Sequence, residues 1–187
     1  MSKFRIHDPS SAPARSKAVL VEAQKTLGFV PNLYGMLAES PALLQGYTTL
    51  SAIFAEGSLT PVERQVVLLS TSFENGCDYC MAAHTALAGM QGMPRKVIVA
   101  IREGDSIDDP KLRALSDFVR QVVRGRGWVP DDEVQSFLDA GYSHAQVLEV
   151  ILGVGIKTMS NYANHLAETP LDTAFEPHRW SKPVHAD

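Results

Sequence analysis

The chain has 187 residues, of which 45% are hydrophobic and 20% charged. This composition suits one folded domain and excludes disorder as the dominant state. The formal net charge is −4 at pH 7, so no basic excess is present to neutralise phosphates, and no nucleic-acid partner is expected. No apolar run approaches the roughly 20 residues that span a bilayer, and the opening residues lack an apolar signal segment. We therefore expect a cytoplasmic protein with no membrane partner.

Helix start and stop signals follow one another along the whole chain. Residues 40–41, 60–61 and 109–110 each place a capping side chain directly before a proline at the first helical position. Short β-branched runs lie between such signals, and no two-residue hairpin turn joins alternating runs. The fold class is therefore predicted to be all-α. The predicted helices span about 14–27, 41–56, 61–74, 77–90, 94–103, 110–124, 130–140 and 143–167.

The segments outside these helices are proline-rich. We expect an extended N-terminal arm over residues 1–12, a turn at Pro31-Asn32, and a loose C-terminal tail over residues 170–187. The tail carries two large apolar side chains, Phe175 and Trp180. These two side chains predict that the tail docks onto this chain or onto a neighbouring subunit.

The two cysteines of the chain, Cys77 and Cys80, form one C-x-x-C pair. A secreted disulfide scaffold would need more cysteines, spread along the chain, so the pair indicates redox chemistry or metal binding. With His84 they fall at i, i+3 and i+7, which is one face of a helix. The Asn75-Gly76 break places Cys77 in the first turn, where free N–H groups and the helix dipole stabilise a thiolate.

This arrangement favours thiol redox catalysis. Cys80 and His84 are i, i+4 neighbours, within reach of a direct or one-water hydrogen bond, so the imidazole can accept a thiol proton. A thiolate attacks a peroxide oxygen or a disulfide sulfur, and the second cysteine resolves the intermediate.

The stretch ERQVVLLSTSFENGCDYCMAAH, inside the motif at residues 60–91, resembles the core of the carboxymuconolactone decarboxylase superfamily. It is most similar to the alkyl hydroperoxidase D-like branch, and weaker similarity extends over residues 27–175. The resemblance implies one all-helical domain over residues 1–187, assembly into homo-oligomers, and thiol-dependent reduction of hydroperoxides. The implied partners are a hydroperoxide substrate and a dithiol or thioredoxin-like reductant.

Carried over by position, the resemblance makes Cys77 and Cys80 the redox pair, with Cys80 attacking the peroxide and His84 accepting the proton. Two positions depart from the branch. Gln65 stands where the family has a glutamate that serves the histidine, and Tyr79 stands where it has a histidine.

Gln65 can form hydrogen bonds but cannot take up a proton. Glu63 and Glu74 are the nearby carboxylates that could substitute for the missing glutamate, although Glu63 is also the expected capping-box acid of Thr60. Asn161, Asn164 and His165 form a polar cluster on the last helix, of which Asn161 or His165 could approach the site or a subunit interface.

Four alternatives stay open. The cysteines could be inert core residues, or they could bind zinc with His84 and a fourth ligand from Glu74 or His165. The chain could also be a general thiol–disulfide oxidoreductase, or a non-catalytic oligomeric protein with a vestigial site. No glycine-rich phosphate loop is present, so no organic cofactor is expected.

Overall fold

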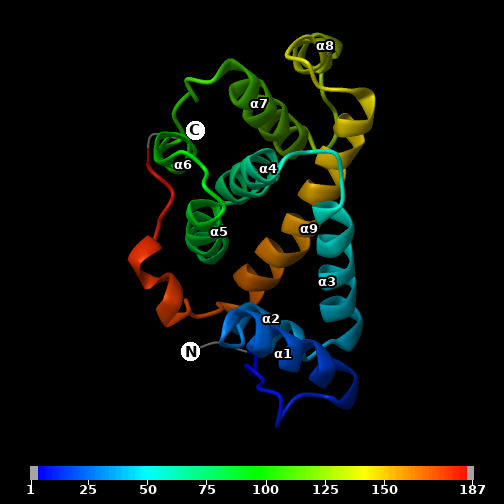
Figure 1. Ribbon diagram of the computed structural model, residues 1–187, viewed down its shortest axis with the longest axis vertical. Helices are drawn as coiled ribbons and strands as arrows, with labels where there is room; N and C mark the ends of the chain where they lie inside the picture. The colour runs from blue at the N-terminus through cyan, green and yellow to red at the C-terminus, as the bar shows by residue number, and fades with distance from the viewer. Residues whose placement is uncertain (1–3, 185–187) are drawn as a thin grey trace.

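The computed structural model describes residues 4–184; residues 1–3 of the predicted arm and 185–187 of the predicted tail lie outside it. The described part of the chain is helical and contains no strand (Figure 1), so the all-α prediction is confirmed. Its elements are α1 (Ala14–Leu27), α2 (Asn32–Leu37), α3 (Pro41–Ala55), α4 (Pro61–Glu74), α5 (Asp78–Met90), α6 (Arg95–Glu103), α7 (Pro110–Arg124), α8 (Asp131–Asp139), α9 (His144–Ala167) and the 3-10 helix η1 (Thr173–His178).

The eight predicted helices agree with the structure to within one residue at each end, and four of them begin at a side-chain cap that the structure forms. The Ser40 side chain caps α3, and Asp109 caps α7. Thr60 and Ser143 each form a complete capping box, with Glu63 on α4 and Gln146 on α9.

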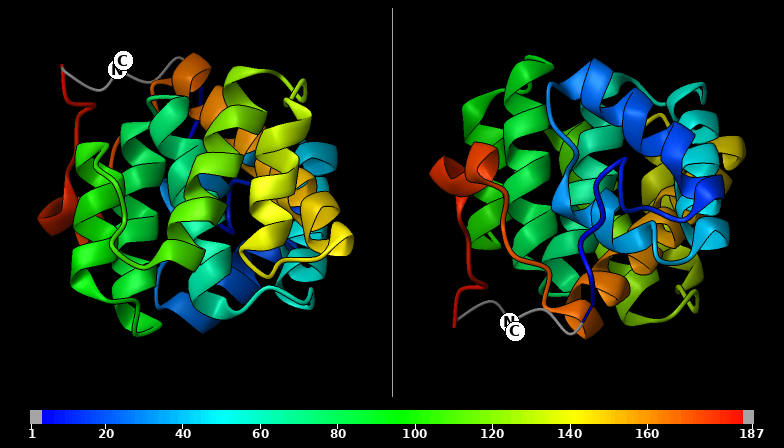
Figure 2. Two further views of the ribbon diagram at one scale, coloured as in Figure 1. Left: turned by 90° about the horizontal axis from the view of Figure 1, so that it is seen from above. Right: turned by 90° about the horizontal axis from the view of Figure 1, so that it is seen from below.

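Helix α4 lies at the centre of the bundle and packs against α5, α6, α7 and α9. Helices α1 and α2 cover one end of the bundle, while α7 and α8 lie at the other (Figure 2). Gly153 lets α9 approach closely, because a Cβ atom there would lie 2.6 Å from Cγ1 of Val67 on α4 and 2.9 Å from Cζ of Phe54 on α3. The long last helix is thereby pressed into the core beside α4 and α5.

Helix α2 is the element that the sequence prediction missed, because a distant side chain supports its start. The predicted turn at Pro31-Asn32 is instead the beginning of this short helix. Its first N–H group, on Asn32, donates to the carboxylate of Asp172 at 3.0 and 3.2 Å. The next N–H group, on Leu33, donates to the Tyr79 hydroxyl at 3.1 Å. Local sequence signals cannot show a cap that lies 140 residues away.

The C-terminal tail is ordered and docks onto its own chain, running beside α5 and α6 (Figure 1). Phe175 packs edge-on against Tyr79, with ring centroids 6.3 Å apart. Trp180 is buried and donates its indole N–H to the carbonyl of Arg102 at 2.8 Å. The predicted docking is therefore confirmed for this chain, while the predicted looseness of the tail is wrong over η1.

Replacing Trp180 by alanine should lower the free energy of unfolding by about 3 kcal/mol, since a buried aromatic ring and its hydrogen bond are both lost. Trp128→Ala is the matched control, because that indole is 88% exposed and should cost little. Urea titrations of both variants measure the difference. Equal effects would show that the docked tail adds no stability.

Candidate active site

The two cysteines lie at the junction of α4 and α5. Helix α4 ends at Glu74, and Gly76 adopts a positive φ of 65° that turns the chain into α5. Cys77 is the N-cap of α5, and its backbone N–H donates to the carbonyl of Ser72 at 2.9 Å. Both thiols are free and buried, with exposed fractions of 0% for Cys77 and 1% for Cys80.

Helix α9 supplies polar partners for both sulfur atoms. The Asn164 side-chain amide donates to Sγ of Cys80 at 3.3 Å and lies 3.9 Å from Sγ of Cys77. Sγ of Cys80 lies 3.8 Å from the Ser160 hydroxyl oxygen. Of the predicted polar cluster on this helix, Asn164 therefore reaches the thiols, while Asn161 accepts a hydrogen bond from Asn75 at 2.9 Å and His165 is exposed.

The two thiols have opposite acidities. Burial opposes ionisation of Cys80, but a hydrogen bond from Cys77 and the positive charge of Lys157 together hold its pKa well below the usual value. The pKa of Cys77 is raised, because its thiol is hydrogen-bonded to Cys80, is buried and faces the negative charge of Cys80. Cys80 is therefore the more acidic thiol of the pair, and Cys77 is the less acidic one.

The start of the helix does not by itself make Cys77 the more acidic thiol. The backbone N–H group of Cys80 lowers the pKa of Cys77, but the side chain of Cys80 and burial raise it by more. The pKa of Cys80 is lowered first by the hydrogen bond from Cys77 and then by Lys157 and Ser160 of α9.

His84 lies near the thiols but is not hydrogen-bonded to either of them within residues 4–184. Its Nδ1 atom is paired with Oε1 of Gln65 at 3.0 Å, and the Gln65 amide donates in turn to Gln91 at 3.2 Å. Burial lowers the pKa of His84 well below its usual value, and the charge of Lys157 lowers it further. The imidazole is therefore neutral at pH 7, as a proton acceptor must be.

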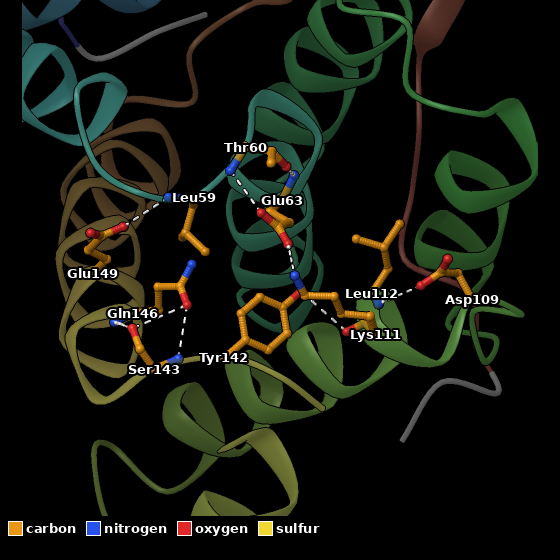
Figure 3. A network of polar contacts seen from close by, with 10 residues as sticks. All are labelled: Leu59, Thr60, Glu63, Asp109, Lys111, Leu112, Tyr142, Ser143, Gln146 and Glu149. Atoms are coloured by element: carbon orange, nitrogen blue, oxygen red, sulfur yellow. Dashed lines mark hydrogen bonds and ion pairs between the residues drawn. The ribbon is translucent and has the colours of Figure 1, made fainter. Parts of the chain in front are cut away.

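Glu63 lies away from the two thiols. Its carboxylate accepts from the backbone N–H of Thr60 at 2.8 Å and pairs with Lys111 at 3.2 Å (Figure 3). It lines neither of the cavities beside the thiols. Glu74, the other substitute carboxylate, pairs with Arg124 at 2.7 Å. The structure thus brings Cys77, Cys80, His84 and Gln65 together but leaves both carboxylates outside the group.

The zinc alternative finds no ligand set in the part of the chain that the structure describes. No group of three or more His, Cys, Asp or Glu side chains there is placed to hold a metal ion. In the same residues, no helix has the length and apolarity needed to cross a membrane.

Two neighbouring cavities meet at this site. The larger, of about 410 Å³, contains Cys80, His84 and Lys157 in its wall, and the smaller, of about 250 Å³, contains Gln65, His84 and Lys157. The other walls of the larger cavity are mostly apolar or aromatic: Leu27, Phe29, Pro31, Leu33, Tyr34, Tyr47, Tyr79, Ala83, Ala86, Leu87, Met90, Ala174 and Phe175. A small organic molecule could enter this space and reach Cys80.

Lys157 is the site residue that the sequence analysis missed. Its side chain is 1% exposed, although lysine is almost never fully buried unless it is paired. The signal was present in the spacing, because Lys157, Ser160 and Asn164 fall at i, i+3 and i+7 among the apolar and small residues of α9. A cation on the buried stripe of a helix indicates a compensating anion nearby.

Comparison with known proteins agrees with this all-α arrangement of helices. The model of the carboxymuconolactone decarboxylase family matches residues 41–121. This match, like the sequence motif, indicates similarity to the carboxymuconolactone decarboxylase family over that segment. No curated protein sequence matches the chain.

Solved structures share the fold over nearly the whole chain. A peroxidase-related protein from Ralstonia eutropha JMP134, with an alkylhydroperoxidase AhpD core, has a TM-score of 0.81 and 23% identity, covering 93% of this chain and 94% of its own. A peroxidase-related protein from Silicibacter sp. TM1040 has a TM-score of 0.77 and 20% identity, with 92% of each chain covered. The debrominase Bmp8, whose C82A variant was crystallised with 2,3,4-tribromopyrrole, has a TM-score of 0.80 and 17% identity, covering 95% and 96%.

The acidities predict a specific pH profile of alkylation. In Cys77→Ser the remaining thiol, Cys80, should react with iodoacetamide at pH 7 and lose reactivity only well below pH 8.5, the pKa of a free thiol. In Cys80→Ser, Cys77 should react appreciably only above that pH, because its own pKa is raised by burial as well as by Cys80. Mass spectrometry of the alkylated protein across pH measures both profiles, and the reverse order would contradict the assignment.

Proposed function

We propose that this protein is a thiol-dependent peroxidase that reduces organic hydroperoxides through Cys77 and Cys80. The observation that carries the proposal is the placement of Cys80, whose pKa is lowered, in the wall of a mostly apolar cavity, with the free thiol of Cys77 three residues away. A thiolate is the nucleophile that peroxide reduction needs, and a neighbouring thiol is the resolving group.

The proposed cycle has three steps. The Cys80 thiolate attacks the terminal oxygen of the hydroperoxide, the O–O bond breaks, and a sulfenic acid forms while the departing oxygen takes up a proton and leaves as an alcohol. Cys77 then attacks the sulfenic sulfur, which releases water and forms the disulfide. A dithiol, such as a thioredoxin-like protein, reopens the bridge by exchange and is itself oxidised.

We assign His84 the role of proton acceptor when the Cys80 thiol first ionises. Its neutral ring lines the same cavity as Cys80, and Gln65 fixes the orientation of the ring. Because glutamine does not titrate, it cannot relay the proton further. The smaller cavity beside Gln65 offers room for water to carry the proton away.

Single-turnover oxidation tests the cycle. The reduced protein mixed with one equivalent of tert-butyl hydroperoxide should lose two thiols, and Cys80→Ser should abolish this reaction. Cys77→Ser should react once and accumulate a sulfenic acid that a trapping reagent labels, since no resolving thiol remains.

Two outcomes would favour other functions. Disulfide exchange with a dithiol but no peroxide consumption would favour a general thiol–disulfide oxidoreductase. Silence in both assays, with both cysteine variants unchanged, would favour a non-catalytic oligomeric protein. The fold shared with a debrominase makes a brominated aromatic compound a further substrate to offer in the same assay.

We also propose that the protein assembles into a homo-oligomer through α9, as the family resemblance implies. Four large apolar side chains of this helix are exposed by 46–70% and lie within one narrow arc of its surface: Leu148, Ile151, Tyr162 and Leu166. A second copy presenting the same face would cover them.

Leu166→Lys should therefore lower the molecular mass measured by light scattering, while the circular dichroism of the helices stays unchanged. Val99→Lys is the control, because that exposed apolar residue lies on α6, away from the stripe. A wild-type protein that is strictly monomeric would contradict the proposal.

A further inference from the structure

The Nζ atom of Lys157 is a buried cation with no hydrogen-bond partner in the described part of the chain. It lies in the wall of both cavities, including the one that contains Cys80. An unpaired buried charge is strongly unfavourable unless an anion compensates it. An anion is therefore expected close to this lysine.

The titratable groups around Cys80 come from four helices. They are Cys77, Tyr79 and His84 on α5, Tyr34 on α2, Tyr47 on α3 and Lys157 on α9. The tyrosines are uncharged at neutral pH, because burial is the largest effect on each and raises its pKa. His84 is neutral as well. Among these groups, this leaves the Cys80 thiolate as the anion and Lys157 as the cation.

Arg64 is the other cation beside the hollow, and it is already engaged. It lines only the smaller cavity, and its guanidinium donates to the backbone carbonyl of Leu59. Lys157 is the cation that shares the larger cavity with Cys80.

We propose that Lys157 is a catalytic residue, whose ammonium pairs with the Cys80 thiolate and then donates a proton to the oxygen that leaves from the hydroperoxide. This inference rests on the proposed peroxidase function and deepens it. It supplies the acid that the cycle requires and that Gln65 cannot provide.

The charges and protons of the cycle then balance. The thiolate gives an electron pair to the terminal oxygen, the O–O bond breaks, and the ammonium gives one proton to the alkoxide, leaving a sulfenic acid, an alcohol and a neutral amine. Condensation with Cys77 forms the disulfide and water. The dithiol reductant supplies two protons and two electrons, which restore the Cys77 thiol, the Cys80 thiolate and the Lys157 ammonium. Neither buried charge is left without its partner at the end of a step.

Lys157→Met tests both roles in the full-length protein. The substitution replaces a buried cation by an apolar side chain of similar length, so the variant should fold. In the Cys77→Ser background, the pH at which Cys80 is half-alkylated should rise by about one unit or more when the charge is lost. Peroxide oxidation at pH 7 should fall by about a hundredfold or more, because thiolate and acid are both lost.

Two further comparisons separate charge from proton donation. At a pH where Cys80 of the Lys157→Met variant is fully ionised, a deficit in the oxidation rate should remain, since the acid is still missing. Lys157→Arg should keep the alkylation profile near that of the wild type but not the oxidation rate, because guanidinium does not release its proton. Lys96→Met removes a lysine that is 69% exposed and should change neither measurement.

An unchanged alkylation profile in Lys157→Met would overturn the ion pair. Equal oxidation rates for wild type and Lys157→Met at full ionisation of Cys80 would overturn the proton transfer. A wild-type protein that does not react with tert-butyl hydroperoxide would refute the proposed function instead, while its alkylation profile would still test the pairing of Lys157 with Cys80.

Discussion

The constraint on which the site depends is a positive charge in the core. Lys157 is buried on the inner face of α9, and a protein tolerates such a charge only with an anion close by. Cys80 is the neighbouring group that can supply that anion. The hydrogen bond from Cys77 and the charge of Lys157 lower the pKa of Cys80, whereas the hydrogen bond to Cys80 and burial raise the pKa of Cys77, which is only three residues away.

Two helices create this arrangement by presenting matched stripes to each other. The stripe on α9 carries a cation, a hydroxyl and an amide, and the stripe on α5 carries two thiols and an imidazole, both at i, i+3 and i+7: Lys157, Ser160 and Asn164 on α9, and Cys77, Cys80 and His84 on α5. Gly153 presses α9 toward α4, so the polar stripe is held in the core. The register of these two helices therefore determines which polar side chains of α9 face the thiols, as well as how the helices pack.

The cavity wall depends on contacts made far along the chain. The Tyr79 hydroxyl donates to Asp172 of the tail at 2.5 Å and accepts from the backbone of α2. One side chain beside the cysteines thus ties together three segments that surround the larger cavity. A histidine at this position, as in the hydroperoxidase branch, would change this local network as well as the chemistry of the site.

The sequence predicted most of the fold and about half of the site, and the difference has a physical cause. Helix boundaries depend on caps a few residues away, so Thr60 and Ser143 were sufficient to place α4 and α9. The cysteine spacing likewise shows which groups share a face. Helix α2 escaped prediction because its cap comes from Asp172, and Lys157 escaped it because a single lysine is ordinarily a surface residue.

Glu63 shows the opposite error, in which a residue near the motif in sequence is distant from it in function. Its carboxylate caps α4 and pairs with Lys111, so proximity along the chain did not bring it to the thiols. Glu63 was a candidate only because it carries a carboxylate, the group that Gln65 lacks. In the proposed mechanism, Lys157 compensates for that loss with a cation instead of an anion.

A lysine in place of a glutamate changes which protonation state of the thiols the site stabilises. A glutamate serving a histidine keeps negative charge near the thiols and favours proton removal. A lysine favours the thiolate itself, so the reduced state is the one in which both buried charges are satisfied. In the proposed cycle, oxidation of Cys80 removes the anion and the ammonium loses its proton in the same step, so both buried charges are absent until the disulfide is reduced. Stabilising the reduced form makes the disulfide easier to reduce. This favours the proposed cycle, in which the reductant must open the disulfide at every turnover.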